Sequence, residues 1–159
     1  MFQDKLQKPQ QVYDVIRKGW FVATAEELFR QRLIHYMINE LSYPQHFIVV
    51  EKALKELPHR DFSMEKPPER RVDIICFAKG VHSRDELYPL IAIECKAVKI
   101  TEKAFHQIEG YNHYLQAYYI SLINEREVYT GCLDPLTGKY CYTKTLPSFP
   151  ELKMACQNV

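Results

Sequence analysis

Two residues of opposite charge lie inside one of the most apolar stretches of this 159-residue chain. Residues 90–97 read Leu-Ile-Ala-Ile-Glu-Cys-Lys-Ala, which places Glu94 and Lys96 two positions apart. Side chains alternate across a β-strand, so both charges are expected on one face of the strand. Burying a carboxylate and an ammonium is costly unless that face meets a partner, a metal or a substrate. The pair is therefore the first candidate for a functional site.

A second carboxylate is placed to join this pair. Asp73 lies near the start of another apolar run, residues 72–78, and the polar residues 80–88 between the two runs predict a hairpin. Neighbouring strands lie about 5 Å apart, so Asp73, Glu94 and Lys96 are expected to meet at one edge of one face. Two carboxylates there suit Mg²⁺, and an adjacent lysine can hold a water or stabilise charge on a phosphate. This set suits hydrolysis of a phosphodiester.

A long helix is predicted before these strands, over residues 24–41. Thr24 and Glu27 have the spacing of a capping box, in which each side chain satisfies a backbone N–H of the other residue. Apolar residues then recur at helical spacing and predict the buried face of the helix. They are Phe29, Leu33, Ile34, Met37, Ile38 and Leu41.

The remaining pattern predicts an α/β fold with a central mixed β-sheet flanked by helices. A second helix opens at Thr101. Because this helix follows the central strand, the next strand is expected to run parallel to it. We expect one domain over residues 1–159, with a lead-in at 1–23, a core at 24–144 and a surface-wrapping tail at 145–159. Strands are predicted at 47–54, 72–78, 90–97, 119–123, 127–132 and 140–143.

Composition limits the class of protein. The formal net charge is +1, so any basic surface for nucleic acid must be local. The five cysteines form no C-x-x-C pair, which predicts free thiols in a reducing compartment. The polar amino terminus has no signal-peptide core, and no run approaches the roughly 20 apolar residues of a membrane span. We expect a cytoplasmic protein without a membrane partner.

Several motifs resemble a known nuclease family. Asp73, twenty intervening residues and Glu94-Cys95-Lys96 are similar to the core of the PD-(D/E)XK nuclease superfamily. More narrowly, motifs over roughly residues 12–130 resemble the nuclease domain at the amino terminus of type I restriction enzyme R subunits. These motifs are Glu27 with Arg30-Gln31, Tyr43-Pro44, Arg71-Val72-Asp73, Ile93-Glu94-Cys95-Lys96 and Gln107-x-x-x-Tyr111.

The resemblance implies a restriction-endonuclease-like core and a set of roles at the site. It implies Mg²⁺, with Mn²⁺ as a substitute, bound by Asp73, Glu94 and the backbone carbonyl of Cys95. It also implies that Lys96 acts on the attacking water. R subunits carry ATP-driven motor domains as well, but the chain contains no G-x-x-x-x-G-K-[ST] motif. Translocation by this chain alone is therefore not expected.

The resemblance also assigns roles on the two helices. Gln107 and Tyr111, one helical turn apart, match a motif close to the active centre that supports DNA handling. Glu27 matches an acid supplied by the first helix. Each has a structural alternative: Glu27 as a helix cap, Gln107 as a polar residue at the helix rim and Tyr111 as a core aromatic. One departure is Val72, which stands where the motif has proline.

Four basic residues flank the predicted site and are candidates for contacts to DNA phosphates. The alternative is a solvated basic rim. These residues are Arg70, Arg71, Lys99 and Lys103.

We therefore expect a Mg²⁺-dependent endodeoxyribonuclease of the restriction type, acting on DNA with restriction-system subunits or as a homodimer. One alternative is a nuclease-like DNA-binding or docking module without turnover. Another is a repair nuclease or an RNA nuclease on the same fold, which these motifs do not separate from the first.

Overall fold

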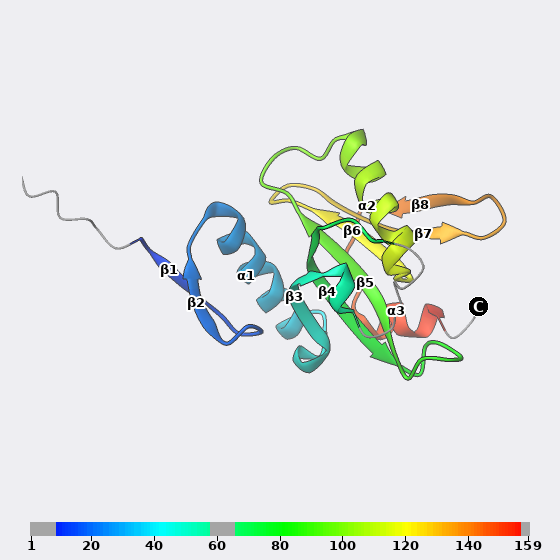
Figure 1. Ribbon diagram of the computed structural model, residues 1–159, viewed down its shortest axis with the longest axis horizontal. Helices are drawn as coiled ribbons and strands as arrows, with labels where there is room; N and C mark the ends of the chain where they lie inside the picture. Colours follow the sequence, from blue (N-terminus) through cyan, green and yellow to red (C-terminus); the bar gives the residue numbers. More distant parts are fainter. Residues whose placement is uncertain (1–8, 58–65, 157–159) are drawn as a thin grey trace, which may run out of the picture.

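The structure is a computed structural model that describes residues 9–57 and 66–156. The first eight residues of the predicted lead-in, Pro58 of the polar connection and the last three residues of the tail lie outside the described residues. Within the described ranges, the predicted α/β fold is confirmed, with a mixed sheet and helices on its two faces (Figure 1).

Six strands form the main sheet, in the order β3-β4-β5-β6-β7-β8. Strands β3, β4 and β5 are antiparallel neighbours, which confirms the predicted hairpin, and β5 pairs in parallel with β6 through the α2 crossover. Strands β7 and β8 continue the sheet in antiparallel pairing. The bounds are β3 Ile48–Ala53, β4 Arg71–Lys79, β5 Leu87–Cys95, β6 Tyr119–Ile123, β7 Val128–Asp134 and β8 Lys139–Thr143.

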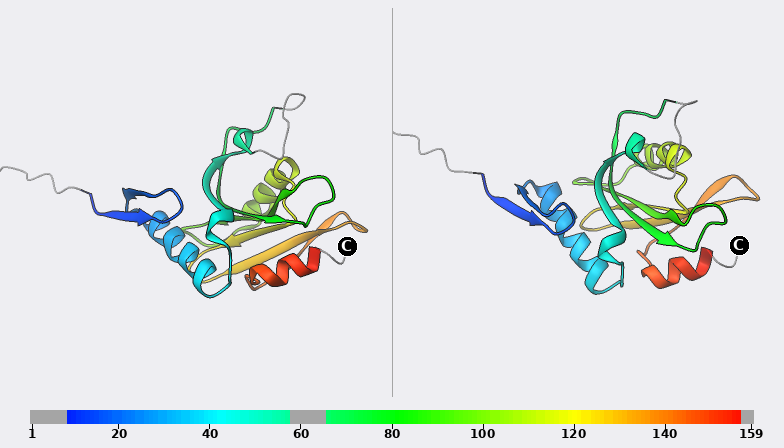
Figure 2. Two further views of the ribbon diagram at one scale, coloured as in Figure 1. Left: turned by 90° about the horizontal axis from the view of Figure 1, so that it is seen from below. Right: turned by 60° about the horizontal axis from the view of Figure 1, so that its bottom comes forward.

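Helices cover both faces of this sheet. Helices α1 and α3 lie on one face and α2 lies on the other (Figure 2). Two short 3-10 turns, η1 and η2, flank β3. The bounds are α1 Ala25–Asn39, α2 Glu102–Leu115, α3 Phe149–Cys156, η1 Gln45–Phe47 and η2 Leu54–Glu56.

The central strands are buried on both faces. On the α1 and α3 side, Ile74 and Ile93 pack with Ile34 and Met37 of α1. On the α2 side, a separate cluster contains Ile75 and Ala92. Burial on both faces explains why β4 and β5 are nearly continuous apolar runs, in which a charged residue requires a specific reason. Within the described ranges, no helix is long and apolar enough to cross a membrane.

The start of α1 follows half of the predicted capping box. The Thr24 hydroxyl accepts the backbone N–H of Glu27 at 3.1 Å, as expected for an N-cap. The reciprocal bond is replaced, because the Thr24 N–H donates to the Val22 carbonyl at 2.9 Å. The Glu27 side chain is thereby released to turn inward. The helix ends at Asn39 rather than residue 41, since Ser42 adopts a positive φ of 58° that breaks the helical path.

The buried face of α1 differs from the prediction. Phe29, Ile38 and Leu41 are only partly buried, whereas Leu33, Ile34 and Met37 lie in the core. The buried face of α1 therefore includes polar residues near the amino end of the helix. The residues of α1 buried in the structure are Glu27, Arg30, Gln31, Leu33, Ile34 and Met37.

The two ends of the described chain are more regular than predicted. The lead-in forms a two-stranded hairpin, β1 Gln11–Asp14 and β2 Gly19–Val22, that lies against α1 (Figure 1). The expectation of a surface-wrapping tail is wrong, because residues 149–156 form α3 and bury Phe149 and Leu152. Here the capping signal was overlooked: Ser148 donates through its backbone N–H and its hydroxyl to the Glu151 carboxylate, both at 2.7 Å.

Candidate active site

Asp73 lies where the β4–β5 ladder ends. Ile74 and Ile93 are the last residues paired between these two strands at this end of the sheet. Beyond that pair, the backbone N–H of Cys95 donates to Oδ2 of Asp73 at 2.7 Å. The Asp73 side chain thus takes the place of a strand-pairing partner, and only 8% of the residue is exposed. The fold fixes this carboxylate between β5 and helix α1.

The environment of Asp73 penalises its ionised form. Burial raises the pKa of the Asp73 carboxyl to about 7, and the nearby negative charge of Glu94 acts in the same direction. The Cys95 N–H and the Arg30 guanidinium lower this pKa without cancelling the increase. A carboxyl with a pKa this far above its usual range is typical of a functional site.

Glu94 and Lys96 form an ion pair, with Nζ of Lys96 2.8 Å from Oε1 of Glu94. Each side chain is about one quarter exposed, at 23% and 24% respectively. Glu94 lies on the α2 side of β5, where it lines a small cavity with Ala92 and Tyr111. The predicted trio therefore lies at one end of the sheet, but the expectation that it shares one face is wrong. Asp73 faces Arg30 of α1, whereas Glu94 lies on the α2 side and pairs with Lys96, which follows the end of β5.

Arg30 of α1 is the centre of a buried ionic network. Its side chain is only 4% exposed, and its Nη2 lies 3.1 Å from Asp73 Oδ1, 2.7 Å from Glu51 Oε1 and 3.0 Å from Glu26 Oε1. Its Nη1 lies 2.8 Å from Glu27 Oε2. Burial lowers the pKa of Arg30, but the surrounding carboxylates outweigh burial and raise it. One guanidinium therefore faces four carboxylates.

Glu51 enters this network through an unusual backbone conformation. It lies within β3 with a φ of 54°, in the left-handed region that side-chain-bearing residues rarely adopt. The β3–β4 register pairs Val50 with Ile74 and Lys52 with Val72, leaving Glu51 and Asp73 outside the paired positions. Strain of this kind tends to occur at functional sites. It brings a second strand-borne carboxylate, besides Asp73, to Arg30.

Glu27 faces the interior at the same place. One carboxylate oxygen contacts Arg30, and the other accepts from Arg17 of the β1–β2 hairpin and from Gln31 Nε2 at 3.0 Å. Arg17 also pairs with the buried Asp14. The Glu27 side chain therefore belongs to the Arg30 network, and the alternative in which it caps the helix is wrong.

The α2 residues lie on the other side of the site. Tyr111 lines the same small cavity as Glu94, and the Arg70 guanidinium lies over its ring, 5.3 Å from the centroid. Gln107 is half-buried one helical turn before Tyr111. Tyr111 therefore lies beside Glu94, whereas Gln107 reaches the vicinity only through its position on the same helix.

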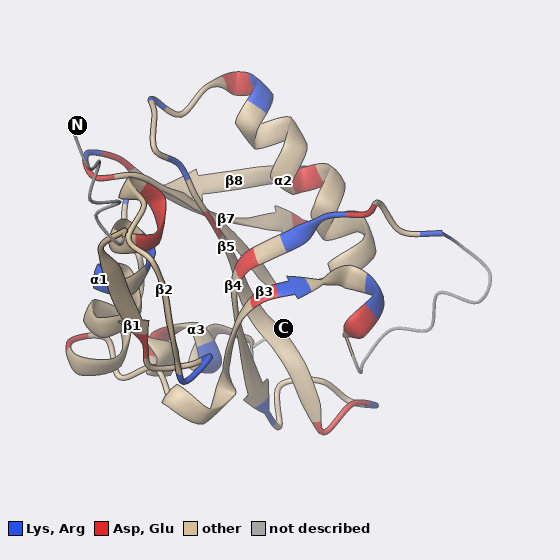
Figure 3. Ribbon diagram, turned by 60° about the vertical axis from the view of Figure 1, so that its left-hand side comes forward, with Lys and Arg blue, Asp and Glu red and all other residues tan. Residues whose placement is uncertain are grey.

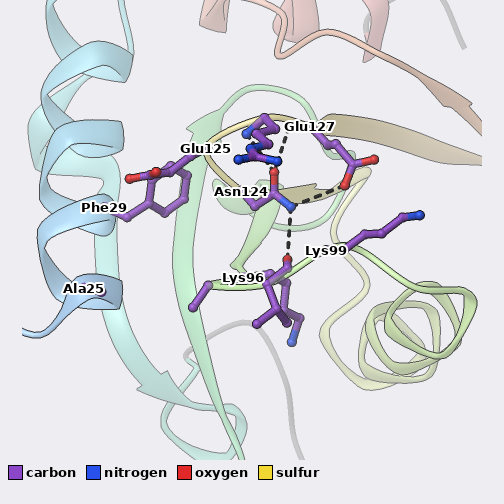
Figure 4. Close-up of a pocket in the computed structure, with 10 residues that line it drawn as sticks. Ala25, Phe29, Lys96, Lys99, Asn124, Glu125 and Glu127 are labelled. Atoms are coloured by element: carbon purple, nitrogen blue, oxygen red, sulfur yellow. Dashed lines mark hydrogen bonds between the residues drawn. The ribbon is translucent and has the colours of Figure 1, made fainter.

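A pocket of about 640 Å³ opens beside Lys96. Its walls are the first turns of α1 with Phe29, the segment after β5 and the β6–β7 turn (Figure 4). Asn124 connects the β6–β7 turn to the segment after β5. Its Nδ2 donates to the Val98 carbonyl at 3.0 Å and to the Glu127 carboxylate at 3.3 Å. Lys96 is thus shared between this pocket, which it lines, and the ion pair with Glu94.

The remaining predicted basic residues are at the surface. Lys99 lines the 640 Å³ pocket, and Arg71 and Lys103 are exposed at the starts of β4 and α2. Figure 3 shows basic and acidic residues interspersed over the described ranges rather than gathered on one face. The exposed basic residues near the site are therefore mixed with acidic residues such as Glu125 and Glu127, which also line the pocket.

The ionisable groups at this end of the sheet are mostly carboxylates. Around Arg30 and Asp73, six carboxylates face three basic side chains, an excess of three negative charges when all are ionised. In the described part of the chain, no three His, Cys, Asp or Glu side chains are arranged as a complete metal site. Two carboxylates and a backbone carbonyl are nevertheless the few protein ligands that Mg²⁺ takes while keeping several waters.

The sequence reasoning missed the central role of Arg30 and all of the role of Glu51. The positions of Glu27, Arg30, Ile34 and Met37 follow helical spacing, so an arginine on the buried stripe was a readable signal. The ion pair of Glu51 with Arg30 depends on the positive φ of Glu51, which no pattern in the sequence predicts.

Comparison with known proteins gives a family. The family model described as "Type I restriction enzyme R protein N terminus (HSDR_N)" matches residues 25–147, which is more than half of the chain. No curated protein and no solved structure matches the chain. The match includes the end of the sheet described above, with Asp73, Glu94 and Lys96. The chain therefore belongs to the family of type I restriction enzyme R protein N-terminal domains, which are nuclease-like domains of restriction–modification systems.

Proposed function

We propose that the chain is a Mg²⁺-dependent endodeoxyribonuclease that hydrolyses phosphodiester bonds in DNA. The observation that carries this proposal is the arrangement of Asp73, Glu94 and Lys96 at the end of β4 and β5. Two carboxylates can hold a divalent cation, and an ammonium at 2.8 Å from one of them can stabilise charge on a phosphate during hydrolysis.

Each residue has a distinct role in this mechanism. Asp73 and Glu94, with the backbone carbonyl of Cys95, would hold the cation. When bound, Mg²⁺ supplies Lewis acidity toward the phosphate and lowers the pKa of a bound water. Lys96, held by Glu94, orients the attacking water and stabilises charge that develops on the phosphate. The attack displaces the 3′ oxygen.

Arg30 keeps the carboxylates in place for this role. Its ion pairs with Asp73 and Glu51 fix side chains that would otherwise repel one another. Arg30 is a positioning residue in this proposal, and so is Glu27, which holds Arg30 from the first turn of α1.

The pocket beside Lys96 provides the path for the substrate. It is lined by Lys99 and Arg126 in addition to Lys96, and these basic residues are placed to contact phosphates on either side of the bond that is cut. Arg70, Arg71 and Lys103 are further candidates for phosphate contacts. Tyr111 and Gln107 lie outside this pocket, on α2, where Tyr111 lines the small cavity beside Glu94.

A net charge of +1 gives the chain little general attraction to DNA. We propose that stable engagement depends on other restriction-system subunits or on a second copy of the chain. As a DNA-cleaving domain it acts in the cytoplasm.

One observation favours a second candidate, a DNA-binding or docking module without turnover. Both Asp73 oxygens have protein partners, Arg30 at 3.1 Å and the Cys95 N–H at 2.7 Å. A cation must therefore share Asp73 with these groups. A carboxylate can accept more than one partner on each oxygen, so the two kinds of contact are compatible.

Nicking of a supercoiled plasmid in the presence of Mg²⁺ or Mn²⁺ tests the proposal. We expect the wild type to nick, and Asp73→Asn, Glu94→Gln and Lys96→Ala each to slow nicking by about 100-fold or more. Two exposed residues provide matched controls: Glu102→Gln and Lys144→Ala should nick at the wild-type rate.

The outcomes separate the two candidates. Binding of DNA without nicking, under both cations, supports the docking module. Nicking that survives in the Asp73 or Lys96 variant contradicts the assigned site. Preferential cleavage of RNA or of damaged DNA would assign the same site to an RNA nuclease or a repair nuclease.

A further inference from the structure

Two of the five cysteines face each other across the last strand pair of the sheet. Cys132 of β7 and Cys141 of β8 are directly opposed in the antiparallel register. Directly opposed residues project their side chains from the same face of the sheet. Both residues also line a pocket of about 500 Å³ between these strands and α3. The fold therefore holds two thiols side by side, far from the candidate active site in the strand order.

The spacing of opposed strand residues is close to that of a disulfide. Cβ atoms of directly opposed residues lie about 4.5–5.5 Å apart. A disulfide needs a Cβ separation of about 3.5–4.5 Å, so an approach of about 1 Å closes the bond. Strand β8 is at the edge of the sheet and is joined to β7 by a short turn, so this adjustment does not disturb the central strands.

Exposure distinguishes this pair from the other cysteines. Cys141 is exposed and Cys132 is half-buried, so an oxidant in solution can reach the pair. Cys76 and Cys95 are buried in the core, where an oxidant in solution does not reach them. Cys156 of α3 is also buried, yet it lies near Cys132 and is the competing partner.

We propose that Cys132 and Cys141 are an oxidation site that forms a reversible intramolecular disulfide across β7 and β8. The oxidant is an external low-molecular-weight disulfide of the glutathione class. The Cys141 thiolate attacks it, forms a mixed disulfide and releases one thiol. The Cys132 thiolate then attacks the Cys141 sulfur and expels the second thiol. The protein loses two protons and two electrons, and the external disulfide is reduced to two thiols.

Oxidation of the full chain with oxidised glutathione, followed by mass spectrometry and thiol counting after denaturation, tests this proposal. We expect the mass to fall by about 2 Da. Two of the five thiols should be lost, and a Cys132–Cys141 linked peptide should appear in a non-reducing digest. Dithiothreitol should restore all five thiols. The closed bond restrains the hairpin, so the melting temperature should rise by a few degrees.

Serine variants make the assignment specific. Cys132→Ser should stop at a mixed disulfide on Cys141, and Cys141→Ser should lose the bridge, whereas Cys156→Ser should oxidise as the wild type does. Equal melting temperatures for the reduced variants and the reduced wild type show that each variant is folded. The proposal is overturned if the oxidised wild type keeps five thiols, or if the linked peptide joins Cys132 to Cys156.

Discussion

Two buried polar networks in this protein are built on different principles. One surrounds Asn112 on the α2 side: its Nδ2 donates to the Ala117 carbonyl and the Tyr140 hydroxyl, each at 2.9 Å, and its Oδ1 accepts the Ala117 N–H at 2.8 Å. It is neutral and geometrically complete. The other surrounds Arg30 on the α1 side and contains four carboxylates on one guanidinium.

The incomplete network is the one that lies at the candidate active site. Among the described residues, the buried side-chain polar atoms without a hydrogen-bond partner are Arg30 Nε and Gln31 Oε1, which both belong to it. Asp73 in the same network has a pKa raised to about 7. A network that served only stability would be satisfied, as the Asn112 network is. This difference supports the proposal that the Arg30 network is arranged for a ligand.

Removing the Arg30 guanidinium should have the largest effect on stability. Arg30→Ala removes the ion-pair partner of Glu51 and Asp73, so we expect the free energy of unfolding to fall by about 3–5 kcal/mol. Chemical denaturation at neutral pH measures this loss. Arg30→Lys keeps the charge but loses the planar fork and should fall between Arg30→Ala and the wild type. A loss below about 1 kcal/mol would show that the carboxylates do not depend on Arg30.

Asp73 should make stability depend on pH. Its folded-state pKa of about 7 exceeds its ordinary value of 3.8, so its protonated form stabilises the fold below about pH 4. This contribution is lost as the pH rises to about 7 and amounts to at most about 4 kcal/mol. Unfolding free energies of the wild type and Asp73→Asn, measured from pH 4 to pH 8, isolate it. Parallel curves for the two proteins would mean that the Asp73 pKa is ordinary.

The neutral network should matter for stability alone. Asn112→Ala removes three hydrogen bonds and leaves the backbone N–H and carbonyl of Ala117 without the Asn112 partner. We expect the free energy of unfolding to fall by about 1–3 kcal/mol. In contrast to the Asp73 variant, it should leave the response of the melting temperature to Mn²⁺ unchanged. Chemical denaturation measures the loss of stability, and thermal denaturation with and without Mn²⁺ measures the response of the melting temperature. If Asn112→Ala abolished the cation response, the division into two networks would fail.

A surface ion pair on the same helix gives the smallest expected effect. Arg32 pairs with Glu125, but the two side chains are 64% and 70% exposed. Arg32→Ala should therefore change the free energy of unfolding by less than about 1 kcal/mol. The same denaturation series that measures Arg30→Ala provides this matched control. A loss as large as that of Arg30→Ala would mean that position on α1, rather than burial, determines the cost.

Much of the frame was predictable from local patterns. The apolar runs predicted the strands that carry Asp73 and Glu94, because central strands buried on both faces leave a strong signal. The strand at residues 119–123 has the predicted bounds. The mixed sheet followed from the helix between β5 and β6, since a crossover of that length joins parallel strands.

The details that were not predictable depend on tertiary structure. The positive φ of Glu51 and the insertion of the Asp73 side chain beside the Cys95 N–H arise where three strands meet, and no local spacing encodes them. Helix α3 was a different failure. Ser148 and Glu151, which cap this helix, are visible in the sequence, but residues 145–159 were expected to wrap the surface rather than to form a helix.

Direct measurement of Mn²⁺ binding by electron paramagnetic resonance tests the central claim, that Asp73 and Glu94 form a divalent cation site. We expect the wild-type chain to bind Mn²⁺ and Mg²⁺ to compete for the same site. Asp73→Asn and Glu94→Gln should each weaken binding by at least about tenfold, and Glu102→Gln should not. Wild-type protein that binds no Mn²⁺, or variants that bind it equally well, would contradict the account.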